Sequence, residues 1–314
     1  VVYVIGHHAF YHFRADQAML APMPFFSDHT VYSAVLVMLL FYSTANLRNQ
    51  RGCTLFKFQI KLFKFDLNES LWGRKLSLKS KVQFEKFNLK SFTAPRFLKL
   101  MAMGLALLAL ILAASRAAWL SLALAALAGF LFYFKKYHRQ GLLFTGLALC
   151  AGIFFQEKIQ TQFAADVSWQ ERLNRYACAA RMVAERPWTG FGPGTFQFQY
   201  FPYQKQEEMT RISRTVPIRE RGPDNYGRGG GAHSEYMQAL AETGYPGLAL
   251  WLILVCFSLY AGIQRYRETG ALFWLLLSLG LFSFFLHGLI NNFLHDARVA
   301  ALVWGMIAAI ARGR

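Results

Sequence analysis

The residues best suited to chemistry stand in GGGAHSEYMQALAETGYPG, at positions 229–247. His233 opens a stretch whose composition predicts a helix as far as Glu242, and we expect His233 to lie in its first turn. Gly244 is a typical helix stop, and the proline two residues later suits the start of another helix. Because the positive end of a helix disfavours a protonated imidazole, His233 should be neutral and able to accept a proton. The alternative is a loop histidine bonded to backbone.

Arg116 is the second candidate, because with Ser115 it interrupts the apolar run LALLALILAASRAAWLSLALAALAG. A charge at bilayer depth costs at least about 2.5–3.5 kcal/mol, so such a residue usually pairs with a partner or binds a ligand. A planar guanidinium binds phosphate through two parallel hydrogen bonds, which favours an anion site. The alternative is an arginine at a hairpin tip that reaches the lipid headgroups.

Further arginines stand in a predicted helix from Glu171 to Ala184, which Arg186 and the following proline should end. Its spacing predicts an apolar stripe, with Arg172, Arg175 and Arg181 lying off it. The residues of that stripe are Leu173, Tyr176, Ala177, Ala180 and Val183. The GFGPG that follows at 190–194 predicts a tight turn. It lacks the residues of a nucleotide-binding loop, and no strand precedes it.

The elements that position these residues are expected to be membrane helices. Of the 314 residues, 55% are hydrophobic, and they form long blocks. Because a span needs about 20 apolar residues, we predict an all-α polytopic membrane protein. Its seven spans are expected near 31–46, 98–114, 117–134, 141–155, 245–262, 271–290 and 297–311.

The charges predict which segments face which side. The net charge is +17, but the Lys and Arg lie mostly between apolar blocks, as expected for cytoplasmic loops rather than for nucleic-acid binding. The expected units are an external segment 1–30, spans in 31–155 with a basic cytoplasmic loop 47–97, an external loop 156–244 and C-terminal spans in 245–314. We expect further spans to precede Val1. The four cysteines imply no disulfide framework.

The chain resembles the bacterial O-antigen ligase and O-antigen polymerase family, membrane glycosyltransferases that use undecaprenyl-diphosphate-linked sugars. The resembling stretches, in order, are PFFSDHTVYSAVLVMLL (24–40), SRAAWLSL (115–122), ERLNRYACAARMVAERPWTGFGPGTFQFQY (171–200) and AHSEYMQALAETGYPGLAL (232–250). Family members usually have around a dozen spans, and the basic loop 47–97 is longer than the family leads us to expect. The resemblance implies a fold like that of the GT-C glycosyltransferases, in the bacterial inner membrane with a periplasmic active site.

The same resemblance implies roles for individual residues. His233 would be the base that activates an acceptor hydroxyl, and Arg116 and Arg172 would hold the lipid diphosphate, with Arg175 as a further candidate. Residues implied to support the site are Glu235, Tyr236, Glu242 and Arg181. No metal-ligand spacing occurs among the carboxylates, so we expect neither a metal nor another cofactor, and an in-line displacement would invert the sugar carbon.

Several functions share this donor. Transfer of the glycan to lipid A–core is the leading hypothesis, and polymerisation onto another lipid-linked glycan is the first alternative. Transfer to a protein hydroxyl and transport of a lipid-linked sugar remain further alternatives. The expected partners are the undecaprenyl-diphosphate-linked glycan, lipid A–core or another glycan acceptor, and the bilayer. His29 and His295, the latter beside Asp296, are expected to be packing or interfacial residues, and His7 and His8 are weaker candidates still, because they lack metal-ligand spacing.

Overall fold

The computed structural model describes residues 1–11, 22, 29–48, 96–134, 166–210, 213 and 231–312. Every regular element in these ranges is a helix, which confirms the all-α prediction for this part of the chain. The elements are α1 (Val2–Phe10), α2 (His29–Arg48), α4 (Arg96–Leu112), α5 (Arg116–Tyr133), α8 (Val167–Glu185), α9 (Phe196–Gln199), η3 (Phe201–Tyr203), η4 (Gln206–Glu208), α10 (Glu235–Thr269), α11 (Leu272–His287) and α12 (Ala297–Arg312).

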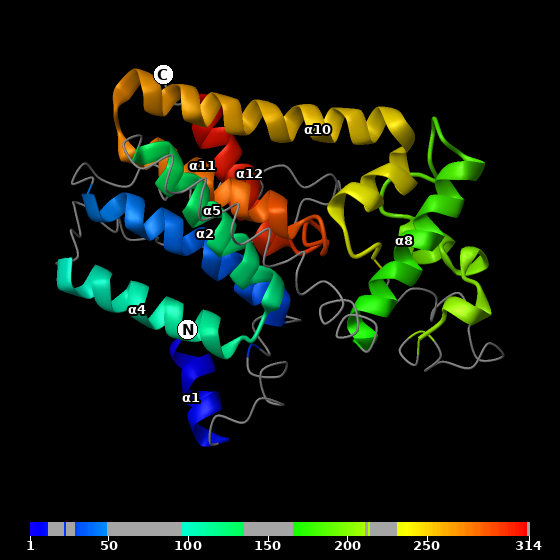
Figure 1. Cartoon of the computed structure of the whole chain (residues 1–314), viewed down its shortest axis with the longest axis horizontal. Coiled ribbons are helices and arrows are strands. Elements are labelled where there is room, and N and C mark those ends of the chain that lie inside the picture. The colour runs from blue at the N-terminus through cyan, green and yellow to red at the C-terminus, as the bar shows by residue number, and fades with distance from the viewer. Residues whose placement is uncertain are drawn as a thin grey trace, which may run out of the picture.

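The apolar helices form a bundle around α11, which contacts α2, α5, α10 and α12. Figure 1 shows α2, α5, α11 and the long arm of α10 running alongside one another, while α8 lies across one end of the bundle. Two buried apolar clusters fill the bundle, one around Leu36 and Ala118 and one around Met38 and Phe284. The bundle thus supplies a rigid base for the elements at its end.

Two of the described helices, α5 and α10, are long and apolar enough to cross a membrane. Shorter apolar helices occupy His29–Ala45, Leu100–Leu112 and Leu272–His287, and α12 covers the last predicted span. These positions agree with the predicted segments, but seven spans are not confirmed. The predicted span 141–155 and residues 49–95 of the basic loop lie outside the described residues.

A sharp kink at Gly244 divides α10 into a short arm, 235–243, and a long arm, 245–269. The backbone of Gly244 has φ +68°, a conformation that L side chains rarely adopt. A Cβ at this position would lie 2.6 Å from the Pro187 carbonyl oxygen, so the approach of that turn also requires glycine. The predicted helix stop is confirmed, and the kink turns the short arm back toward the end of α11, where the Glu235 N–H donates to the Gly288 carbonyl at 2.8 Å (Figure 1).

The helix α8 (Val167–Glu185) is capped by Asp166 and Arg186, and it begins four residues before the predicted start and ends one residue after the predicted end. The residues buried on it are Glu171, Asn174, Arg175, Cys178, Ala179, Met182 and Val183. Leu173 is 48% exposed and Ala180 is also exposed, so the predicted apolar stripe is wrong at these two positions, whereas Val183 is buried and Tyr176 and Ala177 are half-buried. Arg175, predicted to lie off the stripe, is buried instead, because it pairs with Glu171 inside the fold, a pattern that apolar spacing alone misses.

Candidate functional site

His233 lies just before the short arm of α10 rather than in its first turn. Ser234 is the N-cap, and its hydroxyl oxygen accepts the Met237 N–H at 3.3 Å, so the helix begins at Glu235. The backbone of His233 is left-handed, with φ +54°. Such a conformation costs a non-glycine residue about 1–2 kcal/mol, which neighbouring contacts must offset.

Those contacts hold His233 from both sides of its backbone. Its N–H donates to the Asn292 side-chain oxygen at 3.2 Å, and its carbonyl accepts the Tyr176 hydroxyl at 3.1 Å. The side chain of His233 is half-buried. The imidazole is therefore carried on a fixed piece of backbone between α8 and the turn that follows α11.

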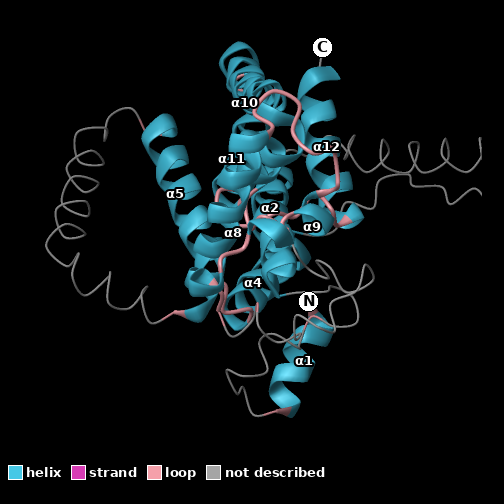
Figure 2. Ribbon diagram, turned by 90° about the vertical axis from the view of Figure 1, so that its right-hand side faces the viewer, coloured by secondary structure: helices cyan, strands magenta, loops and turns pink. Residues whose placement is uncertain are grey.

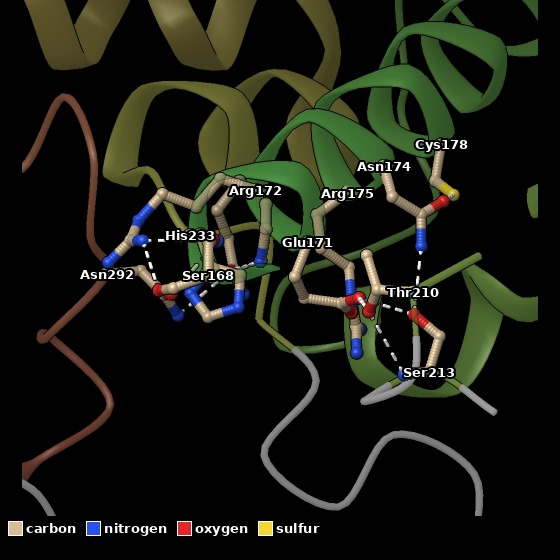
Figure 3. A network of polar contacts seen from close by, with 12 residues as sticks. Ser168, Glu171, Arg172, Asn174, Arg175, Cys178, Thr210, Ser213, His233 and Asn292 are labelled. Carbon is tan, nitrogen blue, oxygen red and sulfur yellow. Dashed lines mark hydrogen bonds and ion pairs between the residues drawn. The ribbon is translucent and has the colours of Figure 1, made fainter. Parts of the chain in front are cut away.

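Arg172 binds the same turn from α8. Its Nε donates to the Ile290 carbonyl at 3.0 Å and one terminal nitrogen donates to the Asn291 side-chain oxygen at 3.3 Å. The other terminal nitrogen reaches the Ser168 hydroxyl at 2.6 Å. Figure 3 shows His233, Arg172, Ser168 and Asn292 gathered on one side of α8.

Tyr176 joins Arg172 to His233. Its hydroxyl lies 3.0 Å from the Leu289 carbonyl as well as 3.1 Å from that of His233, and its one proton serves both. Burial raises the pKa of Tyr176 above its usual value, against the opposing effect of Arg172. The phenol therefore stays protonated and able to donate. Arg172, Tyr176 and His233 converge on the turn at 289–292.

An amide network supports this turn from the short arm of α10. The Gln238 side-chain oxygen accepts the Ala232 N–H at 3.0 Å and the Asn292 amide at 3.2 Å. Its amide nitrogen donates to Glu242 at 2.8 Å and lies 2.7 Å from Nε2 of His295. Because an amide nitrogen can only donate, Nε2 of His295 accepts in this arrangement. The side-chain oxygen of Gln238 thus fixes two residues that adjoin His233, and its nitrogen ties the network to Glu242 and His295.

Arg116 lies at the tip of the hairpin between α4 and α5. It is the first residue of α5, after the N-cap Ser115, and it forms an ion pair with Asp166, the N-cap of α8. Its side chain is 78% exposed. Burial alone would raise the pKa of Asp166, but hydrogen bonds from Arg116 and the Ser168 N–H lower it below its usual value. A guanidinium and two positive helix ends therefore meet at one point.

Arg175 has a different environment, because it is buried within α8. Its Nε donates to Glu171 at 2.9 Å, and its guanidinium lies 4.0 Å over the ring centre of Tyr200. Glu171 also accepts the hydroxyls of Thr210, at 2.5 Å, and Ser213. Burial would raise the pKa of Glu171, yet these hydrogen bonds and the Arg175 charge bring it below its usual value. This cluster lies beside the group around His233, further to the right along α8 in Figure 3.

Glu242 acts as a clamp between α10 and the glycine turn at 190–194. One of its carboxylate oxygens accepts the Gly194 N–H at 2.8 Å, and the other accepts the Phe196 N–H at 3.1 Å. Its carbonyl accepts the Gly192 N–H at 2.8 Å. The predicted tight turn is present, with positive φ at each of its three glycines. The carboxylate of Glu242 is thus occupied by backbone donors.

The other supporting residues hold neighbouring segments. Glu235 is buried, and one of its oxygens accepts the N–H groups of Phe293 at 2.5 Å and Leu294 at 2.8 Å. The Tyr236 hydroxyl donates to the Phe285 carbonyl at 3.2 Å. Arg181 pairs with Glu208 and donates to the Tyr203 carbonyl at 2.7 Å. Glu235 and Tyr236 therefore position backbone at and after the end of α11, whereas Arg181 positions η3 and η4.

The remaining histidines occupy varied places. His8 is buried on α1, and His29 is the first residue of α2. Asp296 pairs with Arg298 and not with His295. His295 instead contacts Gln238, so it belongs to the amide network that supports the turn.

Residues 101–252 match the family model described as O-antigen ligase. This segment, 152 of the 314 residues, is similar to the O-antigen ligase family. The matched segment contains Arg116, Arg172 and His233, whereas the turn at 289–292 lies beyond it. The family and the apolar helices together indicate an integral membrane protein with a ligase- or polymerase-type glycosyltransferase function. No curated protein matches the chain.

Sequence reasoning missed Asn292, Gln238 and the second role of Tyr176. Tyr176 was assigned to an apolar stripe, although a tyrosine beside buried backbone usually uses its hydroxyl. The amide pair Asn291 and Asn292 stands between two apolar segments, and that position was the one available signal. Nothing in the spacing could pair residue 292 with residue 233.

Proposed function

We propose that this protein transfers an oligo- or polysaccharide from undecaprenyl diphosphate to a hydroxyl of lipid A–core, on the periplasmic side of the bacterial inner membrane. The observation that carries the proposal is the convergence of His233, Tyr176 and Arg172 on one turn at the end of the bundle. Arg172 and Tyr176 lie on α8, His233 precedes α10 and the turn follows α11, so three distant segments meet, which favours a shared chemical task.

In the proposed reaction the acceptor oxygen attacks C1 of the first sugar, and the bond from C1 to the diphosphate oxygen breaks. His233 takes the proton from the acceptor hydroxyl as the new glycosidic bond forms. Undecaprenyl diphosphate leaves as an anion. Attack opposite the leaving group inverts the configuration at C1.

The arginines have the task of stabilising the departing diphosphate. Arg116 is exposed beside the positive ends of α5 and α8, where an anion is favoured. Arg172 lies on the second turn of α8, about 9 Å along the helix from Asp166 at 1.5 Å per residue. Fixed guanidinium groups stabilise developing negative charge without rearranging during the reaction, so the proposal needs no metal. Arg175, paired with Glu171, is assigned the structural task of orienting α8.

The test uses membranes that contain the chain, a lipid-linked glycan donor and lipid A–core. His233→Ala should lower transfer by at least about 100-fold, because a general base contributes roughly 10²–10⁴. Arg172→Lys keeps the charge but loses the planar fork, and should lower transfer by about 10–100-fold. His7→Ala, on α1, is the matched control and should leave transfer unchanged.

A blot of cell glycans separates ligation from polymerisation. In cells that depend on the chain, His233→Ala should remove long glycan from lipid A–core while lipid-linked polymer accumulates. Loss of chain length alone would assign the polymerase reaction instead. Full transfer by the His233→Ala protein would overturn the assignment of His233 as the base.

A further inference from the structure

One face of the long arm of α10 is apolar and exposed along its length. Leu250, Ile253, Phe257 and Tyr260 follow one another at helical spacing, and their exposed fractions lie between 61% and 68%. The helix is long and apolar enough to cross a membrane, and little of it is buried inside the protein. This face therefore fits the acyl chains of a bilayer.

Trp188 extends this face at its end nearest the kink. It is 70% exposed and belongs to the turn after α8, not to a membrane helix. Its ring lies 5.9 Å from that of Tyr245, the first residue of the long arm, in an edge-to-face arrangement. Tyr245 is itself 50% exposed. The two rings thus form one exposed aromatic surface where the apolar face begins.

The turn that carries Trp188 is firmly attached to α10. The Tyr245 N–H donates to the Pro187 carbonyl at 2.8 Å, and the Gly190 N–H closes the turn on Arg186 at 3.0 Å. The guanidinium of Arg186 lies 4.6 Å over the Phe191 ring, and its side chain remains about half exposed. A cation beside two amphipathic rings complements the phosphates and the interfacial zone of a phospholipid layer.

We propose that Trp188 and Tyr245 form a membrane-interface contact that seats the turn 186–189 at the boundary between phospholipid headgroups and acyl chains. The occupant is the bilayer itself, because the surface continues the lipid-facing side of α10. The contact fixes the height of the C-terminal end of α8. Through the hydrogen bonds of Phe191 and Gly192 to residues 241 and 242, it also fixes the short arm that follows His233.

The experiment measures tryptophan emission of the full chain in phospholipid vesicles. The chain has seven tryptophans, so the emission of Trp188 is read as the difference between the protein and its Trp188→Phe variant. Lipids brominated near the headgroup should quench most of the emission assigned to Trp188. Lipids brominated at the end of the acyl chain should quench less of it. Aqueous iodide should not quench it in vesicles.

The matched control is Trp169→Phe, which alters a tryptophan at the opposite end of α8. Its difference emission should not follow the depth of the bromine as that of Trp188 does. Quenching of Trp188 by iodide in vesicles, with no effect of brominated lipid, would overturn the proposal. Since Phe keeps an apolar ring at this position, the variant is expected to fold, and its unfolding temperature checks this. The result is independent of glycan transfer, so the two proposals can fail separately.

Discussion

At the scale of single residues, the arginines of α8 and of the hairpin differ by their surroundings rather than by their type. Arg116 is exposed beside an acid, Arg172 spans two segments through neutral oxygens, and Arg175 is buried with Glu171. A buried charge is costly unless it is paired and hydrogen-bonded. The same residue type therefore suits ligand binding at the first two positions and internal support at the third.

Glu171 gives a pH-dependent prediction. Because its folded pKa is below the usual 4.5, its contribution to stability is present above that value and is lost as the pH falls through the folded pKa. Glu171→Gln should lower the free energy of unfolding at neutral pH by about 3 kcal/mol, since Arg175 loses its buried partner. The difference from the native chain should shrink as the pH falls below about 4.5. Unfolding in detergent across pH measures this, with the exposed Glu207→Gln as control.

If the difference in unfolding free energy between the native chain and the Glu171→Gln variant stayed constant down to the lowest pH, the assigned role of the Glu171 carboxylate would be contradicted. The sequence could not predict this role, because Glu171 meets Thr210 and Ser213 only after folding. The pairing with Arg175 was available in principle, since residues four apart lie on one helix face. Its burial was not, because nothing local distinguishes a buried pair from an exposed one.

At the scale of elements, the glycine turn and the kink of α10 form one joint. Gly190 approaches the Glu242 carbonyl so closely that a Cβ there would lie 2.4 Å from its oxygen, and Gly244 approaches Pro187 in return. The sequence predicted both features separately, because glycines punctuate helices and turns by their backbone freedom. That the two features contact each other depends on tertiary packing, which single-sequence patterns do not contain.

Because only one of them lies at this joint, we expect alanine substitutions at two helical glycines to have very different effects on stability. Gly244→Ala places a Cβ 2.6 Å from the Pro187 oxygen at a positive φ, and should lower the unfolding free energy by more than about 2 kcal/mol. Gly104→Ala, in α4, meets nothing within 4 Å and should be neutral or stabilising by up to about 1 kcal/mol. Thermal unfolding of both proteins in detergent compares them. Similar losses in the two variants would show that the joint is not a critical contact.

At the scale of the whole molecule, α8 connects the hairpin of α4 and α5 to α10. Its first end meets Arg116 through Asp166, and its last end meets Tyr245 through Pro187. Figure 2 shows α8 between α5 and α9 at the end of the bundle. The order of helices was largely predictable from apolar blocks, since a span has a characteristic length. This connection was not, because it rests on single contacts between distant segments.

Variants of the ion pair between Arg116 and Asp166 can distinguish anion binding by Arg116 from structural support of α8 by the pair. Arg116→Gln should lower glycan transfer by about tenfold or more, because it removes a charge proposed to hold the diphosphate. Asp166→Asn keeps a good N-cap and should keep transfer within about threefold. Both changes should alter unfolding by less than about 1 kcal/mol, as expected for an exposed pair. Transfer assays on both variants measure this, and equal losses would indicate that the pair only braces α8.

Because α8 is attached to the rest of the protein at both ends, its length is constrained. With 19 residues at 1.5 Å each, the helix sets a separation of about 28 Å between its two anchors. Inserting or deleting one residue would change that span and also rotate one end by about 100° relative to the other. Insertions and deletions within α8 should therefore be poorly tolerated, because they would displace one of its two attachments relative to the other.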